Sequence, residues 1–191
     1  MTELGNGLSA AYRQEDALSV QEAQLSMRRR LGMSEEMLLP TQGNLANTYS
    51  LLGQKEEALR LRRDVYFGYV KLHGDENFRT LTVANNYAMS LLDLHCYAEV
   101  RSVMRKEMHV AQSVLGQSNE VTLKMRWNYG LALYRDPGAT LDGLREAVTT
   151  LEETERIARR VMGGAHPLTA DIEDELRDYR AALRAREALS P

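Results

Sequence analysis

Apolar residues recur at intervals of three and four along most of this chain. The clearest run follows Lys55 and contains Ala58, Leu61, Val65, Tyr69 and Leu72. This period is typical of an α-helix that buries one face. A shorter run at about 39–52 has the same period, and Gly53 follows it, where a left-handed glycine can end a helix. The pattern therefore predicts a helix over 39–52 and a second helix from Lys55 to Gly74.

This helical pair is repeated with a period of 42 residues. Three residue types share the interval, at Leu39–Leu81–Leu123, Asn44–Asn86–Asn128 and Gly32–Gly74–Gly116. In the third copy five residues are inserted, because 19 residues separate Asn128 from Ala147 whereas 14 separate Asn44 from Ala58. A helical pair can bury its apolar stripe only against neighbouring pairs, so the repetition predicts a solenoid.

The repeat also predicts boundaries. We expect an incomplete repeat at 1–38 with a helix from Tyr12 to Leu31, complete repeats at 39–80 and 81–122, a repeat at 123–167 with its insertion near 136–143, and a capping helix within 168–191, from Leu168 to Leu189. Asp75 is expected to help start the helix that follows Gly74.

Composition narrows the class of protein. The chain has 28 Leu and 20 Ala but only 2 Ile, which favours helices over a sheet. Its net charge of −3 argues against a general affinity for nucleic acid. No apolar run approaches the roughly 20 residues that cross a bilayer, and the N-terminus lacks a secretory signal. The cytoplasm is therefore the default location, with a targeting segment that has already been removed as the alternative. The single cysteine, Cys96, precludes an internal disulfide.

The segment from Asn44 to Ala58 resembles a tetratricopeptide repeat (TPR), with Leu-Ala, Leu-Gly and Glu-Ala pairs in the family's places. The 42-residue period and the segment Gly163-Gly-Ala-His-Pro-Leu-Thr169 are similar to the kinesin-light-chain type. The resemblance covers residues 12–187. It implies an all-α, right-handed α–α superhelix of about eight antiparallel helices, a non-catalytic role in protein–protein interaction, and a concave face lined by the first helix of each repeat.

On that face Asn44, Asn86 and Asn128 would form a ladder. Packed helices lie about 8–10 Å apart, close to three residues of an extended peptide, and a carboxamide can both donate to and accept from a peptide backbone. Alternatively, these amides bind neighbouring backbone or hold adjacent repeats in register. Trp127 could likewise anchor a ligand or pack between repeats. The predicted partner-binding set is Asn44, Asn47, Asn85, Asn86, Met89, Lys124, Trp127, Asn128, Leu131 and Arg135, in which Lys124 and Arg135 would favour an acidic residue.

Other functions have less support. Gly43 and Asn128 occupy places where a clamp for chaperone tails needs basic residues. His73, His95, Cys96, His109 and His166 are scattered without zinc-ligand spacing, so we expect no metal, cofactor or catalytic site. The arginines at 28–30, 60–63 and 159–160 are expected on a solvated convex face. The rival hypothesis is a structural subunit built permanently into a large assembly, with the insertion and the arginine clusters as contacts. A regulatory fragment of a longer protein is a third alternative.

Overall fold

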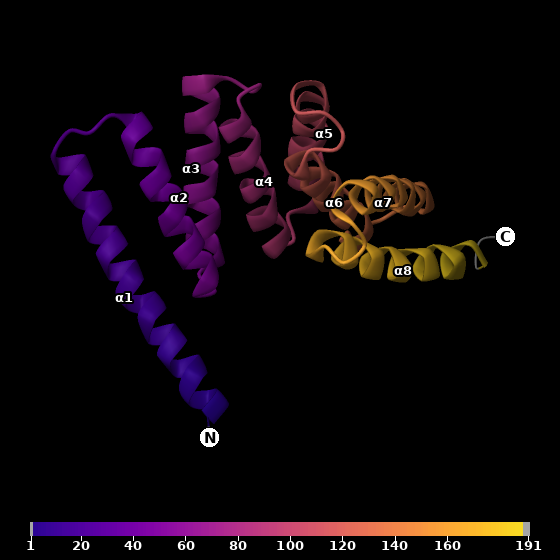
Figure 1. Cartoon of the computed structure of the whole chain (residues 1–191), viewed down its shortest axis with the longest axis horizontal. Helices are drawn as coiled ribbons and strands as arrows, with labels where there is room; N and C mark the ends of the chain where they lie inside the picture. The colour runs from indigo at the N-terminus through magenta and orange to yellow at the C-terminus, as the bar shows by residue number, and fades with distance from the viewer. Residues whose placement is uncertain (1, 189–191) are drawn as a thin grey trace. The chain divides into compact units, whose positions relative to one another are not determined.

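The computed structural model describes residues 2–188, which form eight α-helices and, within that range, no strand (Figure 1). The chain divides into two compact units, with the boundary after Gly74. The first unit contains α1–α3 and the second contains α4–α8. The predicted all-α class is therefore confirmed for the described residues.

The first unit consists of α1 (Thr2–Arg30), α2 (Glu35–Leu51) and α3 (Lys55–His73). Helix α2 lies between the other two and packs against both. Its side towards α1 contributes to a cluster of buried apolar residues: Leu25, Leu45, Ala46 and Leu61, with Leu18, Leu38 and Tyr49 packed around them. The three-and-four spacing read from the sequence thus marks the buried face of α3 from Ala58 to Tyr69, whereas Leu72, near the end of the helix, is 40% exposed.

The ends of these helices differ partly from prediction. Gly53 and Gly74 have φ angles of +75° and +79°, so the two predicted glycine stops are confirmed. Helix α2 begins at Glu35 rather than at 39, because Ser34 occupies the N-cap position and two glutamates in the first turn complement the helix dipole. The helix continues through Pro40. Helix α1 begins ten residues before Tyr12, at Thr2.

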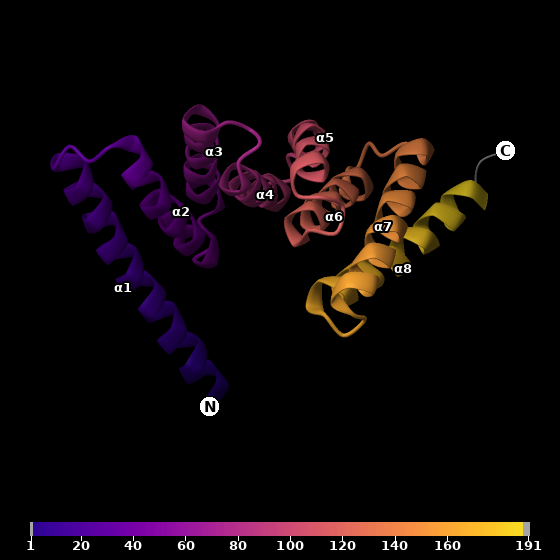
Figure 2. The ribbon, with the colours of Figure 1, turned by 45° about the horizontal axis from the view of Figure 1, so that its top comes forward.

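The second unit consists of α4 (Phe78–Asp93), α5 (Tyr97–Val114), α6 (Glu120–Arg135), α7 (Leu141–Met162) and α8 (Pro167–Ala188). Each helix packs on the next, and in addition α4 packs on α6 and α6 on α8 (Figure 2). The core of this unit includes residues less than 2% exposed: Leu81, Leu91, Val100, Met104, Leu123, Met125, Leu151, Ile172 and Tyr179.

Two asparagines that lie 42 residues apart cap the N-terminal ends of α4 and α6, which are the first helices of two successive repeats. Asn77 Oδ1 accepts from the Arg79 amide at 2.8 Å, and Asn119 Oδ1 accepts from the Val121 amide at 2.9 Å. Asp75 was expected to help start α4. It instead forms an ion pair with Lys106 at 3.1 Å, because the N-cap position falls two residues later. The repeat therefore includes the capping chemistry as well as the apolar stripe.

The insertion before α7 is a tight turn. Asp136 Oδ1 accepts from the Gly138 amide at 2.9 Å, and Thr140 Oγ1 caps α7 by accepting from the Gly143 amide at 3.1 Å. Arg101 on α5 donates to Asp136 at 2.5 Å and ties the turn to α5. The inserted residues therefore both lengthen this turn and extend the N-terminal end of α7, which begins six residues before Ala147.

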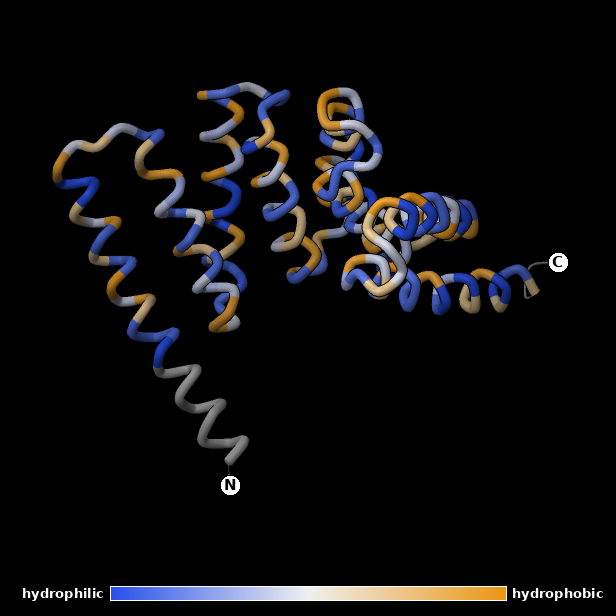
Figure 3. The backbone as a smooth tube through the Cα atoms, viewed as in Figure 1, coloured by the Kyte–Doolittle hydropathy of each residue, from blue (hydrophilic) through white to orange (hydrophobic). Residues whose placement is uncertain are grey.

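Helix α8 has two different faces, which appear as alternating orange and blue along its tube in Figure 3. Leu168, Ile172, Leu176 and Tyr179 are buried, and the Tyr179 ring stacks on Tyr134 of α6 with 3.6 Å between centroids. Because α8 packs on α7 and α6, as α6 packs on α5 and α4, it occupies the place of the first helix of a further repeat. None of the described helices combines the length and apolar character needed to span a membrane.

Candidate functional site

A groove with a volume of about 450 Å³ runs over α4, α6 and α8 in the second unit. Its lining contains eight of the ten residues predicted from the sequence, together with Leu92, Asp93 and Glu175. The eight are Asn85, Asn86, Met89, Lys124, Trp127, Asn128, Leu131 and Arg135. The 42-residue period brings these residues together because it places equivalent residues of α4 and α6 side by side.

Apolar side chains form the middle of the groove. Met89 is 45% exposed, whereas Leu131 is buried and Trp127 half-buried. Trp127 also borders a second hollow, so its ring separates two concave surfaces. Its indole Nε1 is shielded from solvent and has no hydrogen-bond partner among the described residues. The tryptophan therefore both packs against the fold and presents a surface to the groove.

An amide pair lies beside these residues. Asn128 Nδ2 donates to Asn85 Oδ1 at 2.9 Å, and the two side chains are only 5% and 6% exposed. Asn85 Nδ2 is in turn 3.9 Å from the sulfur of Met89, which is a weak acceptor. Asn128 is thus bonded to the neighbouring repeat, as the register interpretation expects, while half-buried Asn86 lines the groove.

The remaining two predicted residues lie in the first unit. Asn44 and Asn47 are exposed on α2, and Asn47 Oδ1 accepts from Arg62 Nη2 at 3.2 Å. The participation of Asn44 in a ladder with Asn86 and Asn128 stays a prediction.

The two predicted cations of the groove already have carboxylate partners. Lys124 Nζ is 2.6 Å from Glu120 Oε1, and the ammonium group holds the pKa of Glu120 below its usual value. Arg135 Nη2 is 2.7 Å from Glu175 Oε1. Because each charge is compensated locally, these cations give little preference for an acidic ligand.

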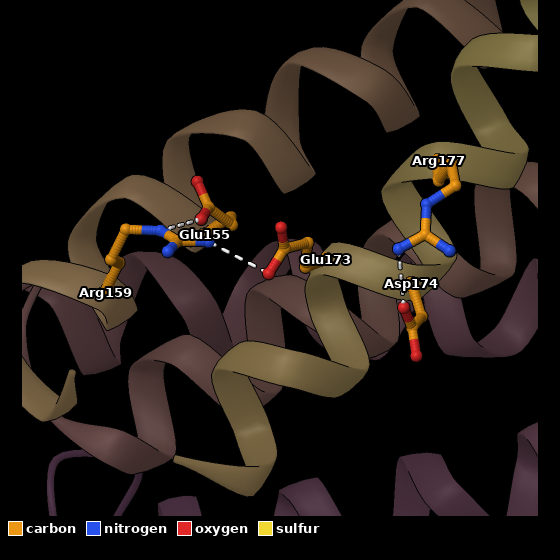
Figure 4. Close-up of polar contacts among 5 residues, drawn as sticks. All are labelled: Glu155, Arg159, Glu173, Asp174 and Arg177. Carbon is orange, nitrogen blue, oxygen red and sulfur yellow. Dashed lines mark hydrogen bonds and ion pairs between the residues drawn. The ribbon is translucent and has the colours of Figure 1, made fainter. Parts of the chain in front are cut away.

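The second hollow, of about 470 Å³, is acidic. It is lined by Trp127, Tyr134, Arg135, Asp171, Asp174, Glu175 and Asp178. The four carboxylates follow one another at helical spacings of three, one and three, which places them on one face of α8. Asp174 pairs with Arg177 at 2.9 Å (Figure 4), and Glu175 pairs with Arg135. No ion pair is recorded for Asp171 or Asp178 among the described residues.

The sequence does not predict this acidic face, because the repeat pattern indicates only a capping helix within residues 168–191. The spacing of the glycines does contain a signal for the place of α8 in the repeat. Gly163 follows Gly116 by 47 residues, and the same interval from Asn128 reaches Glu175. With the insertion included, Glu175 occupies the position on α8 that Asn86 and Asn128 occupy on α4 and α6.

Ion pairs cover the other side of α7 and α8. Arg159 lies between Glu155 and Glu173, with N–O distances of 2.5 and 2.9 Å (Figure 4). Arg180 lies 2.7 Å from Glu152. Exposed pairs of this kind contribute about 0–1 kcal/mol each. Arg159 is thus a paired residue of a solvated face.

No cluster of potential metal ligands occurs among the described residues.

Comparisons with known proteins agree with this architecture. No family model and no curated protein matches the chain. The chain is similar to two crystal structures of a putative kinesin light chain from Podosopora anserina with nearly identical TPR-like repeats. One has a TM-score of 0.72 at 18% identity, over 97% of this chain and 92% of that one. The other has a TM-score of 0.70 at 20% identity, over 98% and 95%.

The crystal structure of BtubC (BKLC) from P. vanneervenii is also similar, with a TM-score of 0.59 at 14% identity over 90% of this chain and 75% of that one. The chain therefore has a TPR-like repeat fold, similar to that of kinesin-light-chain-like proteins. This fold is commonly a protein-interaction module and is typically non-catalytic.

Proposed function

We propose that the groove over α4, α6 and α8 binds an extended segment of a partner protein, and that the chain is a non-catalytic interaction module or adaptor. The observation that carries this proposal is the meeting of an exposed methionine, a tryptophan and polar amides in one groove. Flexible methionine and rigid aromatic surfaces are typical contacts of peptide-binding sites. The groove volume suits a few side chains rather than a folded domain.

The ligand segment is proposed to place a large apolar residue against Trp127, Leu131 and Met89. Its backbone would bond to Asn86. Asn85 Nδ2 can add a further bond, since a ligand carbonyl is a better acceptor than the Met89 sulfur that it now faces. Asn128 would support this amide from behind through its bond to Asn85.

The charges of the site favour a basic residue beside the apolar one. Beyond Trp127 the hollow contains four carboxylates and the single arginine Arg135. A Lys or Arg of the ligand would lie near Asp171 and Asp178 and gain charge complementarity. This revises the acidic ligand expected from Lys124 and Arg135, whose charges Glu120 and Glu175 offset.

A peptide library tests this proposal. The full chain is used to select from random peptides of about 12 residues, long enough to cross three packed helices. Selected peptides should share a large apolar residue near a Lys or Arg. Met89→Glu should weaken their binding about 10-fold or more, because it places a charge at the centre of the apolar contact. Val161→Glu, at an exposed position on α7, is the matched control.

Asp178→Asn should weaken only the peptides with a basic residue. Equal affinities of all variants would reject the groove as the binding site. The structural-subunit hypothesis makes a different prediction, since the chain would then purify with fixed partners at constant stoichiometry through high salt, and Met89→Glu would leave that association intact.

A further inference from the structure

Helix α1 has two apolar faces, of which the structure covers one. Leu18 and Leu25 face α2 and belong to the core of the first unit. Three large apolar side chains lie elsewhere: Val20 and Met27 in the C-terminal half of the helix, and Leu31 directly after its end. They are 69%, 63% and 65% exposed. At 100° per residue, Val20 and Met27 lie about 140–180° around the helix from Leu18 and Leu25. A second apolar stripe therefore points away from α2.

This stripe is continuous. Ala23, between Val20 and Met27, is exposed on the same side, and a shallow groove of about 520 Å³ is lined by Ala23, Ser26, Met27, Arg30 and Leu31. Three exposed large apolar side chains on one helical face are more than the scattered exposed residues of an ordinary surface. They mark an interaction surface.

Charged residues flank the stripe at both ends. Asp16 lies one turn before Val20, and Arg30 lies just before Leu31, both exposed and on the edge of the same face. Neither side chain has an ionic or hydrogen-bond partner among the described residues. The other charged side chains nearby point elsewhere, since Glu22 accepts from the Tyr49 hydroxyl and Arg28 donates to the Met37 carbonyl, both on α2.

We propose that two copies of this chain associate through α1, with the two helices antiparallel around a twofold axis near Ala23 and Gln24. The residue numbers show which side chains of the two α1 helices would lie opposite each other. With the axis midway between residues 23 and 24, Val20 lies opposite Met27 of the second copy, because their numbers sum to 47. The numbers of Asp16 and of Arg30 in the second copy sum to 46, so these two residues are offset along the helix by one residue, or about 1.5 Å. A long arginine side chain spans this offset.

The charge pattern selects this orientation. In the antiparallel pair Asp16 of each helix faces Arg30 of the other, and the twofold axis makes this contact twice. A parallel pair would instead place Arg30 beside Arg30 and Asp16 beside Asp16. The surface is self-complementary in one orientation only, which favours a second copy over an unrelated apolar partner.

Sedimentation or light scattering of the full chain tests the association. The expected mass rises with concentration from 21.6 kDa to twice that value. Met27→Glu should weaken the dimer about 30-fold or more, since it places a charge at the centre of the interface. Leu51→Glu, at a more exposed apolar position of α2, should leave it unchanged. A chain that stays monomeric up to about 100 µM, or a dimer that persists in Met27→Glu, would overturn the proposal.

A charge exchange tests the orientation. Asp16→Arg and Arg30→Asp should each weaken the dimer about 10-fold, and the double variant should restore the affinity to within about threefold, because it recreates both pairs with reversed sign. A double variant as weak as the single ones would reject the antiparallel register.

Cross-linking supplies an independent measurement. In a Cys96→Ser background, Ala23→Cys should form a disulfide-linked dimer readily, since the two copies of this position meet near the axis. Glu56→Cys, exposed on α3, should not. Equal cross-linking of both variants would indicate random collision and contradict the proposed interface.

Discussion

Asn128 Nδ2 donates a 2.9 Å hydrogen bond to Asn85 Oδ1, and this bond joins α6 to α4. Both side chains are buried, so the bond holds two neighbouring repeats at a fixed level. It connects residues that are not equivalent in the 42-residue period, since the equivalent of Asn128 is Asn86. Among the three asparagines of the expected ladder, Asn128 therefore has a structural partner within the fold.

Replacing this amide should destabilise the second unit. Asn128→Ala leaves the buried Asn85 Oδ1 without its donor, and we expect a loss of about 1–3 kcal/mol in the free energy of unfolding, measured by chemical denaturation. Asn47→Ala, whose side chain is exposed and bonded to Arg62, should change the stability by less than about 0.5 kcal/mol. In the double variant Asn85→Ala, Asn128→Ala the loss should be smaller than the sum of the single losses. Strict additivity would show that the bond contributes nothing.

Two glycines inside helices of the first unit should respond to alanine with opposite sign. At Gly68 an added Cβ would lie 2.6 Å from Cδ2 of the buried Leu39, so Gly68→Ala should cost about 1–3 kcal/mol. At Gly43 nothing lies within 4 Å of the added atom, and Gly43→Ala should stabilise by up to about 1 kcal/mol through helix propensity. The comparison requires only the denaturation midpoints of both variants. The same sign for both would contradict the packing of α3 on α2.

Asp136 should titrate at lower pH than an ordinary carboxyl group. Arg101, whose guanidinium donates to it at 2.5 Å, is the largest cause that lowers its pKa below 3.8, followed by the Gly138 amide. Because folding favours the ionised form, this contribution to stability is complete above pH 3.8 and is lost as the pH falls below that value through the folded pKa.

The carboxyl resonance of Asp136, followed by NMR, measures this directly. Arg101→Gln should move the titration midpoint back towards 3.8 without reaching it, since the Gly138 amide still donates. Arg105→Gln, on the same helix but bonded to Tyr129, should leave the midpoint unchanged. A midpoint that does not move in Arg101→Gln would assign the shift to the turn alone.

The stacked rings of Tyr134 and Tyr179 should carry much of the attachment of α8. Tyr179 is buried, with its ring 3.6 Å from that of Tyr134. Tyr179→Ala removes this ring from the core and should cost about 3–5 kcal/mol in the unfolding of the second unit. Tyr179→Phe keeps the ring and should retain most of that stability. If both variants lost the same amount, the hydroxyl rather than the ring would secure the helix.

Local sequence chemistry predicted much of the fold. The start of α3 at Lys55, its end before Gly74 and the turn near Asp136 follow from apolar period, glycine and turn residues, which act over a few neighbouring positions. The start of α2 at Glu35 was missed because the apolar period begins only at Leu39, while the helix also includes an exposed, acidic first turn. Caps and first turns are polar, so a search for apolar stripes does not find them.

The site was predictable where the period was regular. Met89 of α4 and Leu131 of α6, which are 42 residues apart, both line the groove, as equivalent positions of two repeats should. The Asn85–Asn128 bond was not predictable, because it depends on the angle at which two helices pack. Glu175 was hidden by the five-residue insertion, which shifts α8 out of the 42-residue count although it leaves the helix in the same structural place.

Helix α8 separates two tasks by face. Leu168, Ile172, Leu176 and Tyr179 hold it to the protein, whereas Asp171, Asp174, Glu175 and Asp178 line the acidic hollow beside the groove. No residue belongs to both sets. The charge of this hollow can therefore change during evolution, or by design, through exchanges at Asp171, Asp174 and Asp178, whereas Glu175 also pairs with Arg135 of α6. Under the proposed function, α8 thus offers a way to redirect the choice of ligand while α4–α7 keep the same architecture.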